Sequence, residues 1–228
     1  MEILLGKGTV FEITGDGQVF RVDMRLRPSG ASGLLVSSLG AFERYQENEA
    51  WTWEHQALVR ARVLVGCKQV GAAFEQVRAS VLGRERDLPT LRQEVSEMRA
   101  KMRDNLGTRI TAAGLGENAF EATVPFDLKQ DAGGIVDIEF MVQYAALAWS
   151  QSHPPLLRWT DNIRILEGLE QVGLMPATDA SLLREAYKAF RAVAHRQALQ
   201  KEAGVVTGDQ FVVERQHVRR IWSELGLG

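Results

Sequence analysis

The chain has 228 residues, of which 45% are hydrophobic and 25% are charged. This length and composition suit one large domain or two small ones with a well-buried core. A formal charge of -2 and a pI near 6.1 argue against a protein whose main role is to bind nucleic acid. The sequence holds no apolar run of about 18 residues, so we expect no membrane span.

Two further features of the composition point to the cytoplasm. The single cysteine, Cys67, cannot form an internal disulfide, which fits a reducing compartment. The first residues have no basic region followed by a long apolar run, so we expect no signal peptide. We therefore expect a cytoplasmic protein.

The N-terminal segment predicts a β-hairpin over residues 8–27. A β-prone run at 9–14 is followed by a Gly-Asp-Gly turn at 15–17, and residues 18–27 alternate apolar and polar side chains. A Pro-Ser-Gly sequence at 28–30 then ends the second strand.

Alternation in the second strand places Asp23, Arg25 and Arg27 on one face, each about 6.5 to 7 Å from the next. A carboxylate beside two guanidinium groups suits a site where a magnesium ion meets a polyphosphate. The carboxylate would hold the cation, and the arginines would bind phosphate oxygens. The alternative is a solvated sheet face with cross-strand ion pairs. Spacing alone favours the solvated face, because charge clusters mark functional sites only in some cases.

From Ser38 onward the apolar spacing is helical. We predict helices in eight segments: one capped by Ser37 or Ser38 that contains Phe42 and Tyr45, then 51–65, 68–82, 88–105, 135–150, 161–172, 178–202 and 209–225. Leu91, Val95 and Met98 should mark the buried side of the fourth helix, and residues 107–125 read as a long loop before a short strand at 126–129. The predicted fold class is therefore mainly α (α+β), with a small β-hairpin followed by an α-helical bundle.

A second candidate site lies at residues 129–140, Lys-Gln-Asp-Ala-Gly-Gly-Ile-Val-Asp-Ile-Glu-Phe. The two glycines permit a sharp turn and a close approach to a ligand. Asp137 and Glu139 follow in the first turns of a helix, about 200° apart around its axis, so both cannot point straight into one pocket. The alternative is that these acids only complement the helix dipole.

Two further segments carry aromatic and charged side chains. Residues 47–62 hold two tryptophans, a histidine and two arginines, which would suit a nucleotide pocket. The favoured interpretation is that Trp51 and Trp53 are core or interdomain anchors and that His55 is a hydrogen-bonded structural residue. In residues 158–164, Thr160 or Asp161 is a good helix cap, which explains that segment by itself.

Taken together, four segments resemble glutamine synthetase adenylyltransferase. They are Val-Asp-Met-Arg-Leu-Arg-Pro-Ser-Gly at 22–30, the Tyr-Gln-x-Asn-Glu-Ala-Trp-Thr-Trp-Glu-His-Gln-Ala-Leu-Val-Arg-Ala-Arg run at 45–62, Asp-x-Gly-Gly-Ile-x-Asp-Ile-Glu-Phe at 131–140 and Trp-Thr-Asp-Asn-x-Arg-Ile-Leu at 159–166. Their order and spacing also match that family, from about residue 18 to the C-terminus.

The resemblance implies a two-headed enzyme that controls nitrogen metabolism. One half transfers AMP from ATP to a tyrosine of glutamine synthetase, and the other removes it by phosphorolysis. The segments look like the C-terminal, AMP-adding half, with the end of a nucleotidyltransferase domain at 1–66 and a helical domain at 67–228. Transfer would be a metal-assisted in-line displacement. Glutamine synthetase and the PII signal protein are the implied partners, with no nucleic acid and no membrane.

The resemblance also implies roles for individual residues. Asp23 matches the third metal-binding aspartate of the nucleotidyltransferase fold, where it would be catalytic and bind Mg2+. Arg25 and Arg27 match arginines near the ATP phosphates. Asp137 or Glu139 is expected at the rim of the nucleotide pocket.

Residues 1–22 depart from the family pattern. The first two metal-binding aspartates should follow a Gly-Ser turn before Asp23, and no such segment occurs there. We therefore expect a truncated or domain-delimited fragment that is inactive alone. The alternative is a non-catalytic helical module that binds glutamine synthetase or PII. A related transferase that modifies PII is a third reading, against which the 45–62 run argues.

Overall fold

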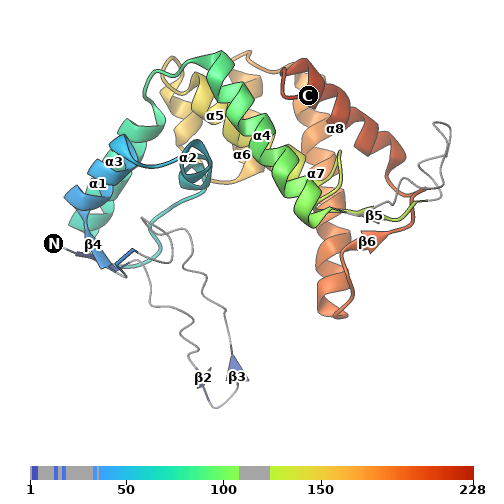
Figure 1. Ribbon diagram of the computed structural model, residues 1–228, viewed down its shortest axis with the longest axis horizontal. Helices are drawn as coiled ribbons and strands as arrows, with labels where there is room; N and C mark the ends of the chain where they lie inside the picture. Colours follow the sequence, from blue (N-terminus) through green and yellow to red (C-terminus); the bar gives the residue numbers. More distant parts are fainter. Residues whose placement is uncertain (1, 5–12, 15–16, 19–32, 35, 108–123) are drawn as a thin grey trace. The chain divides into compact units, whose positions relative to one another are not determined.

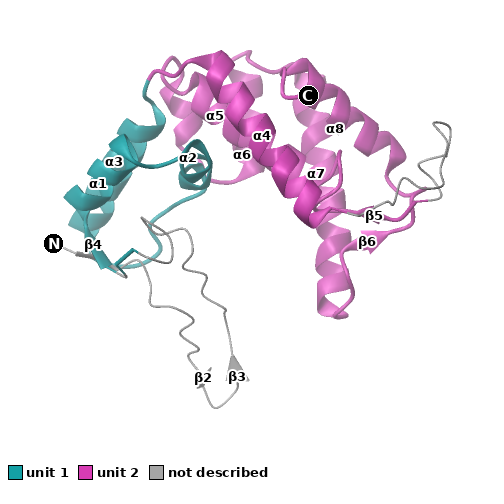
Figure 2. Cartoon of the chain, viewed as in Figure 1, with its two compact units in different colours: residues 1–84 teal, residues 85–228 magenta. Residues whose placement is uncertain are grey.

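Two compact units make up the chain. The computed structural model describes residues 2–4, 13–14, 17–18, 33–34, 36–107 and 124–228. Unit 1 comprises residues 1–84 and unit 2 residues 85–228 (Figure 2). Helices account for most of the described chain, which confirms the mainly α prediction.

Unit 1 contains two short antiparallel strand pairs. β1 (Glu2–Leu4) pairs with β4 (Val36–Ser38), and β2 (Ile13–Thr14) pairs with β3 (Gly17–Gln18). Thr14 is the register partner of Gly17, which confirms the predicted hairpin in its described part. The rest of the predicted second strand lies outside the described residues.

Three helices follow in unit 1: α1 (Leu39–Asn48), α2 (Thr52–Val59) and α3 (Lys68–Leu82). Ser38 begins α1 as predicted, because its hydroxyl oxygen accepts the Ala41 amide hydrogen at 3.2 Å. α3 packs on both α1 and α2, and the rings of Phe42 and Phe74 lie 5.7 Å apart. This packing makes α3 part of unit 1 (Figure 2).

α2 is shorter than predicted, because it ends at Val59 and not near Val65. The buried side chain of Arg78 on α3 donates to the carbonyl oxygens of Leu58 at 3.1 Å and Val59 at 2.7 Å. A cation at these last carbonyls ends the helix favourably. The apolar residues at 63–65 are exposed, so no packing contact would stabilise a longer helix.

The predicted domain boundary at residues 66 and 67 concerns the evolutionary domains of the family and stays a prediction. The compact units divide further along, after Arg84. The division falls there because α3 buries Val77, Val81 and Leu82 within unit 1.

Unit 2 is a helical bundle built around one apolar helix. Its helices are α4 (Leu88–Leu106), α5 (Ile135–Trp149), α6 (Asn162–Gln171), α7 (Ala177–Leu199), α8 (Val212–Glu224) and the short 3-10 helix η3 (Pro154–Leu157). Figure 1 labels the five long helices of the unit. α5 contacts α4, α6, α7 and α8, and most of its side chains are buried. It is therefore the core helix of the unit.

Two details of unit 2 differ from the sequence prediction. The buried stripe of α4 continues from Leu91 and Val95 to Arg99, whereas Met98 is only half-buried. The reason is helical spacing, since residues four apart share a face and Arg99 has a buried acidic partner. The short strand β5 (Phe126–Asp127) pairs antiparallel with β6 (Val205–Val206), which the sequence analysis did not identify.

None of the helices in the described ranges is long and apolar enough to cross a bilayer.

The capping contact of Arg78 predicts a specific effect on α2. Arg78→Met keeps most of the side-chain volume but removes the donors to the last carbonyls of the helix. We expect it to destabilise α2 locally by about 2 kcal/mol, because buried carbonyls lose their partners. Hydrogen exchange of α2 amides, followed by mass spectrometry, measures this loss. Arg62→Met, on an exposed arginine, is the matched control and should leave the exchange unchanged. Equal exchange in both variants would contradict the capping role.

Candidate functional site

The predicted site residues fall into two groups. Asp23, Arg25 and Arg27 lie outside the described residues, so their predicted contacts with metal and phosphate stay predictions. Asp137 and Glu139 lie in α5 of unit 2, and their surroundings are described below. The geometry of the candidate site is therefore that of the Gly133–Gly134 turn and the start of α5.

The two glycines let the turn approach neighbouring backbone in unit 2 closely. Gly133 has a φ of +89°, in the left-handed region that favours glycine. A Cβ atom there would lie 2.7 Å from the carbonyl oxygen of Arg215 on α8, and one on Gly134 would lie 2.7 Å from that of Leu128. Both distances are too short for a side chain, so the turn approaches protein backbone on each side.

Asp137 is buried and forms an ion pair with Arg99. Its Oδ1 accepts a hydrogen bond from Arg99 Nε at 2.5 Å, and its Oδ2 accepts from the Gly133 amide at 2.6 Å. Arg99 also donates from Nη2 to the Gln130 carbonyl oxygen at 2.7 Å. Burial lowers the pKa of the Arg99 guanidinium, and the Asp137 charge opposes that shift. The pair joins α4, the glycine turn and α5.

Glu139 faces a different part of the bundle. It is half-buried, and its Oε1 accepts a hydrogen bond from the Tyr187 hydroxyl of α7 at 3.2 Å. Asp137 contacts α4 instead, so the two acids diverge around the helix as their angular separation predicts. Each has a packing contact within unit 2, and nucleotide binding by either stays a prediction.

The segment before the glycines is held by its own hydrogen bonds. Asp127 Oδ1 accepts from the amides of Lys129 and Gln130 at 2.8 and 2.9 Å, and Asp131 Oδ2 accepts from the Asp127 amide at 2.8 Å. From α8, Arg219 Nε donates to the Ala132 carbonyl oxygen at 3.0 Å. Short polar side chains of this kind order a turn by binding nearby backbone.

Arg215 is a second buried arginine of unit 2 that the sequence analysis missed. Its guanidinium lies 4.0 Å from the centroid of the Phe126 ring and donates to the Gly208 carbonyl oxygen at 2.9 Å. Like Arg99, it occupies an apolar position of a helix, next to Val218 and Trp222 in the buried set of α8. For both arginines, the sequence feature that could have predicted burial is a charged residue at helical spacing within an apolar stripe.

The aromatic run in unit 1 is partly structural. His55 is fully buried, with Nε2 2.8 Å from the Gln46 carbonyl oxygen and Nδ1 3.5 Å from Arg84 Nη2, which confirms the structural interpretation. Trp51 is 71% exposed, so it is not a core residue of this chain, and its alternative role as an interdomain anchor stays a prediction. It stays outside because it precedes α2, where Glu54 accepts its amide hydrogen at 2.9 Å.

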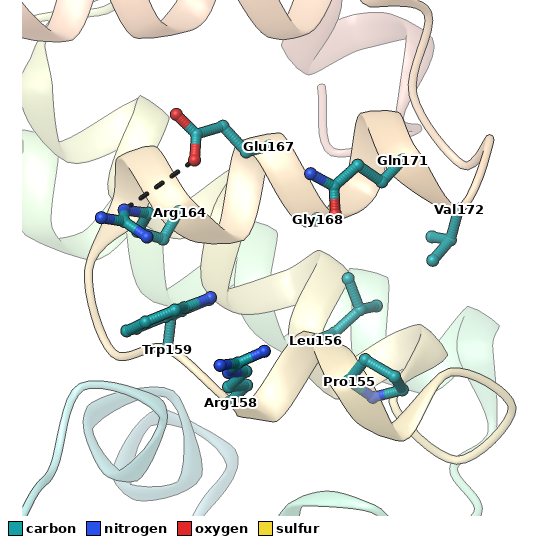
Figure 3. A pocket seen from close by; sticks show the side chains of 9 residues that line it. All are labelled: Pro155, Leu156, Arg158, Trp159, Arg164, Glu167, Gly168, Gln171 and Val172. Atoms are coloured by element: carbon teal, nitrogen blue, oxygen red, sulfur yellow. Dashed lines mark ion pairs between the residues drawn. The ribbon is translucent and has the colours of Figure 1, made fainter.

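The segment at 158–164 begins α6 and flanks a small pocket. Asp161 caps the helix, since its Oδ1 accepts the Arg164 amide hydrogen at 2.9 Å, which confirms the capping prediction. Trp159 lies at the edge of a pocket between η3 and α6 (Figure 3).

No group of three or more potential metal ligands from His, Cys, Asp and Glu occurs among the residues that the structure describes.

Models of known protein families match segments in both units. Residues 9–77 match the family model for glutamate-ammonia ligase adenylyltransferase, and residues 96–221, more than half of the chain, match that for GlnD PII-uridylyltransferase. The bifunctional glutamine synthetase adenylyltransferase/adenylyl-removing enzyme of Pseudomonas putida is 80% identical over 214 residues, which are 94% of this chain and 22% of that protein. The protein of the same name from Hahella chejuensis is 50% identical over 212 residues, 93% of this chain and 21% of its own length.

The chain belongs to the glutamine synthetase adenylyltransferase family. It spans about a fifth of the length of the curated relatives that it matches. Each family model lies within one compact unit, because residues 9–77 fall in unit 1 and residues 96–221 fall in unit 2. The Asp137–Arg99 pair lies in the part that matches the PII-uridylyltransferase model.

The buried pair predicts how this member of the family responds to a change at Asp137. Asp137→Asn leaves the Arg99 charge buried without an anionic partner. We expect the free energy of unfolding of unit 2 to fall by about 3 to 5 kcal/mol. Urea unfolding followed by circular dichroism measures the loss.

The matched control is Glu185→Gln, which removes the exposed pair of Glu185 and Lys188. That change should cost less than about 0.5 kcal/mol. The double variant Arg99→Met, Asp137→Leu should lose less stability than Asp137→Asn, since no charge remains buried. A cost for Asp137→Asn no larger than that of the control would contradict the role of the pair.

Proposed function

We propose that this chain is part of the enzyme that transfers AMP from ATP to a tyrosine of glutamine synthetase and so regulates nitrogen assimilation. The observation that carries the proposal is the 80% identity over 94% of the chain to an enzyme of that name. The Pro-Ser-Gly-Ala-Ser-Gly sequence at 28–33 and the Asn-Glu-Ala-Trp-Thr-Trp-Glu-His run at 48–55 favour the AMP-adding half.

Within that half, we propose distinct roles for the acidic and basic residues of the predicted strand. Asp23 would hold a magnesium ion, because a carboxylate is a preferred ligand of this hard cation. Arg25 and Arg27 would bind the phosphates of ATP through their planar guanidinium groups. Bound magnesium would supply charge neutralisation at those phosphates.

The described acids fit this site less directly. The Asp137 carboxylate already accepts hydrogen bonds from Arg99 and Gly133, which supports a role in holding the glycine turn. Glu139 is half-buried beside Tyr187 and remains the better candidate for the pocket rim. We therefore propose Asp137 as a positioning residue and Glu139 as a contact of the nucleotide.

On the family resemblance, the residues of this chain would not make up a full magnesium site. The resemblance implies two aspartates before the position of Asp23, and the first 22 residues hold one aspartate, Asp16, within a Gly-Asp-Gly sequence. One carboxylate leaves most of the coordination shell of magnesium to water and phosphate. We propose that the chain alone does not transfer AMP, and we assign no chemical step to the metal in it.

A second candidate function is a helical module that binds protein. Unit 2 forms a compact body with its own buried core, centred on α5, and matches a family model over 96–221. Such a unit would bind glutamine synthetase or the PII signal protein without chemistry of its own. The two candidate functions differ in whether this chain binds magnesium-ATP.

The role of Asp23 is tested in a full-length relative. Changing the aspartate equivalent to Asp23 to asparagine should lower AMP transfer to glutamine synthetase by about a thousandfold, since a metal ligand is lost. Incorporation of labelled AMP measures the rate. Asp209→Asn, on an exposed aspartate of unit 2, should keep the full rate. Near-normal transfer by the Asp23 variant would refute the assignment.

The chain by itself should show no AMP transfer when mixed with magnesium-ATP and glutamine synthetase. Robust incorporation of labelled AMP would refute that expectation. Calorimetric titration with magnesium-ATP then separates the two candidate functions. Binding that disappears in Asp23→Ala supports a surviving part of the nucleotide site. A folded chain that binds no nucleotide supports the protein-binding module.

A further inference from the structure

Trp159 is a half-exposed tryptophan held between two arginines. Its ring centroid lies 5.0 Å from the Arg158 guanidinium carbon and 4.6 Å from that of Arg164, and its side chain is 39% exposed. Figure 3 shows one guanidinium group on each side of the indole. This stacking fixes a large apolar surface at the edge of unit 2 without burying it in the core.

The indole forms one wall of a small cavity, which we name the Trp159 notch. It lies between η3 and α6, with Leu156 and Gly168 at its floor and Val172 at its far end (Figure 3). Gly168 permits this close approach, because a Cβ atom there would lie 3.3 Å from Leu156 Cδ2. A glycine inside a helix costs about 1 kcal/mol relative to alanine, so the close fit of η3 on α6 has to offset that cost.

The size of the notch limits what it can hold. Its volume is about 240 Å³. Pockets for small organic ligands usually measure about 300 to 1,000 Å³. The notch is below that range but large enough for one apolar side chain of a protein segment. Tryptophan and arginine are also the side chains most often found at the centres of protein interfaces.

The charges around the notch favour an acidic partner. Two arginines and one acid, Glu167, line the notch. The Glu167 carboxylate lies 3.9 Å from Arg164 Nε. Both members of that pair are exposed, at 52% and 43%, so the pair is weak and leaves Arg164 able to bind another carboxylate. Arg158 forms no ion pair within the described ranges. Asp161, close by in sequence, is engaged at the start of α6.

We infer that the Trp159 notch is a docking site for an acidic segment of another protein. An apolar side chain of the segment enters the notch against Trp159 and Leu156, and flanking carboxylates bind Arg158 and Arg164. The site lies wholly in unit 2 and does not depend on AMP transfer or on Asp23.

The test uses the full chain labelled with 15N and a synthetic acetylated peptide, Asp-Glu-Leu-Glu-Asp. The chain has five tryptophans, and Trp159→Phe identifies the indole N–H resonance of Trp159. We expect that resonance to shift saturably with the acidic peptide and not with Lys-Lys-Leu-Lys-Lys. Replacing the central leucine of the probe by glycine should weaken binding, because the notch then stays empty.

The double variant Arg158→Gln, Arg164→Gln should weaken binding of the acidic peptide at least tenfold. Arg196→Gln, on an exposed arginine in the last turn of α7, is the matched control and should bind as well as the unmodified chain. Thermal unfolding of each variant checks that unit 2 stays folded.

Several results would overturn the inference. The first is that the Trp159 resonance does not shift at millimolar acidic peptide. The second is that Arg196→Gln weakens binding of the acidic peptide as much as the double variant does. If inorganic phosphate alone shifted the Trp159 resonance as much as the acidic peptide does, the notch would be a site for small anions. A shift that follows the concentration of the chain without peptide would show self-association through the notch.

Discussion

The bundle of unit 2 depends on one buried ion pair, between Arg99 of α4 and Asp137 of α5. Taking two charges out of water costs several kcal/mol for each, and only close pairing with full hydrogen bonding offsets that cost. Here the carboxylate accepts hydrogen bonds from Arg99 and the Gly133 amide, and the guanidinium also donates to the Gln130 carbonyl, while its buried Nη1 has no hydrogen-bond partner among the described residues. The pair can form only when α4, the glycine turn and α5 are all in place. It therefore selects one arrangement of these three elements among those that hydrophobic burial alone would allow.

The glycine turn places the start of α5 between α4 and α8. On one side Gly133 lies against the Arg215 backbone, and on the other Gly134 lies against the Leu128 carbonyl. α5 then runs through the bundle with most of its side chains buried, in contact with the four other long helices of unit 2. A sequence such as Asp-x-Gly-Gly-Ile-x-Asp can be read as a ligand-binding turn. In this structure its glycines and its second aspartate have identified packing roles.

The two units match the family in different ways. Unit 1 holds the segment that matches the adenylyltransferase model and, outside the described residues, the predicted metal and phosphate residues. Unit 2 holds the part that matches the PII-uridylyltransferase model and a core of its own. A helical unit of this kind can present a surface such as the Trp159 notch separately from the proposed site of AMP transfer. The proposed nucleotide site and the proposed docking site can therefore be tested separately.

The sequence by itself determined the helices, their caps and the family. Helical periodicity and the caps Ser38 and Asp161 are local signals, and local hydrogen bonds act on them directly. Tertiary structure alone decided that α2 ends at Val59, because the cation that caps it comes from Arg78 on another helix. It likewise decided that Arg99 and not Met98 is buried, since burying an arginine is favourable only when other elements of the fold supply partners for its donors, as Asp137 does here. Periodicity marks which face of a helix is apolar, but it does not show which buried charges will find partners.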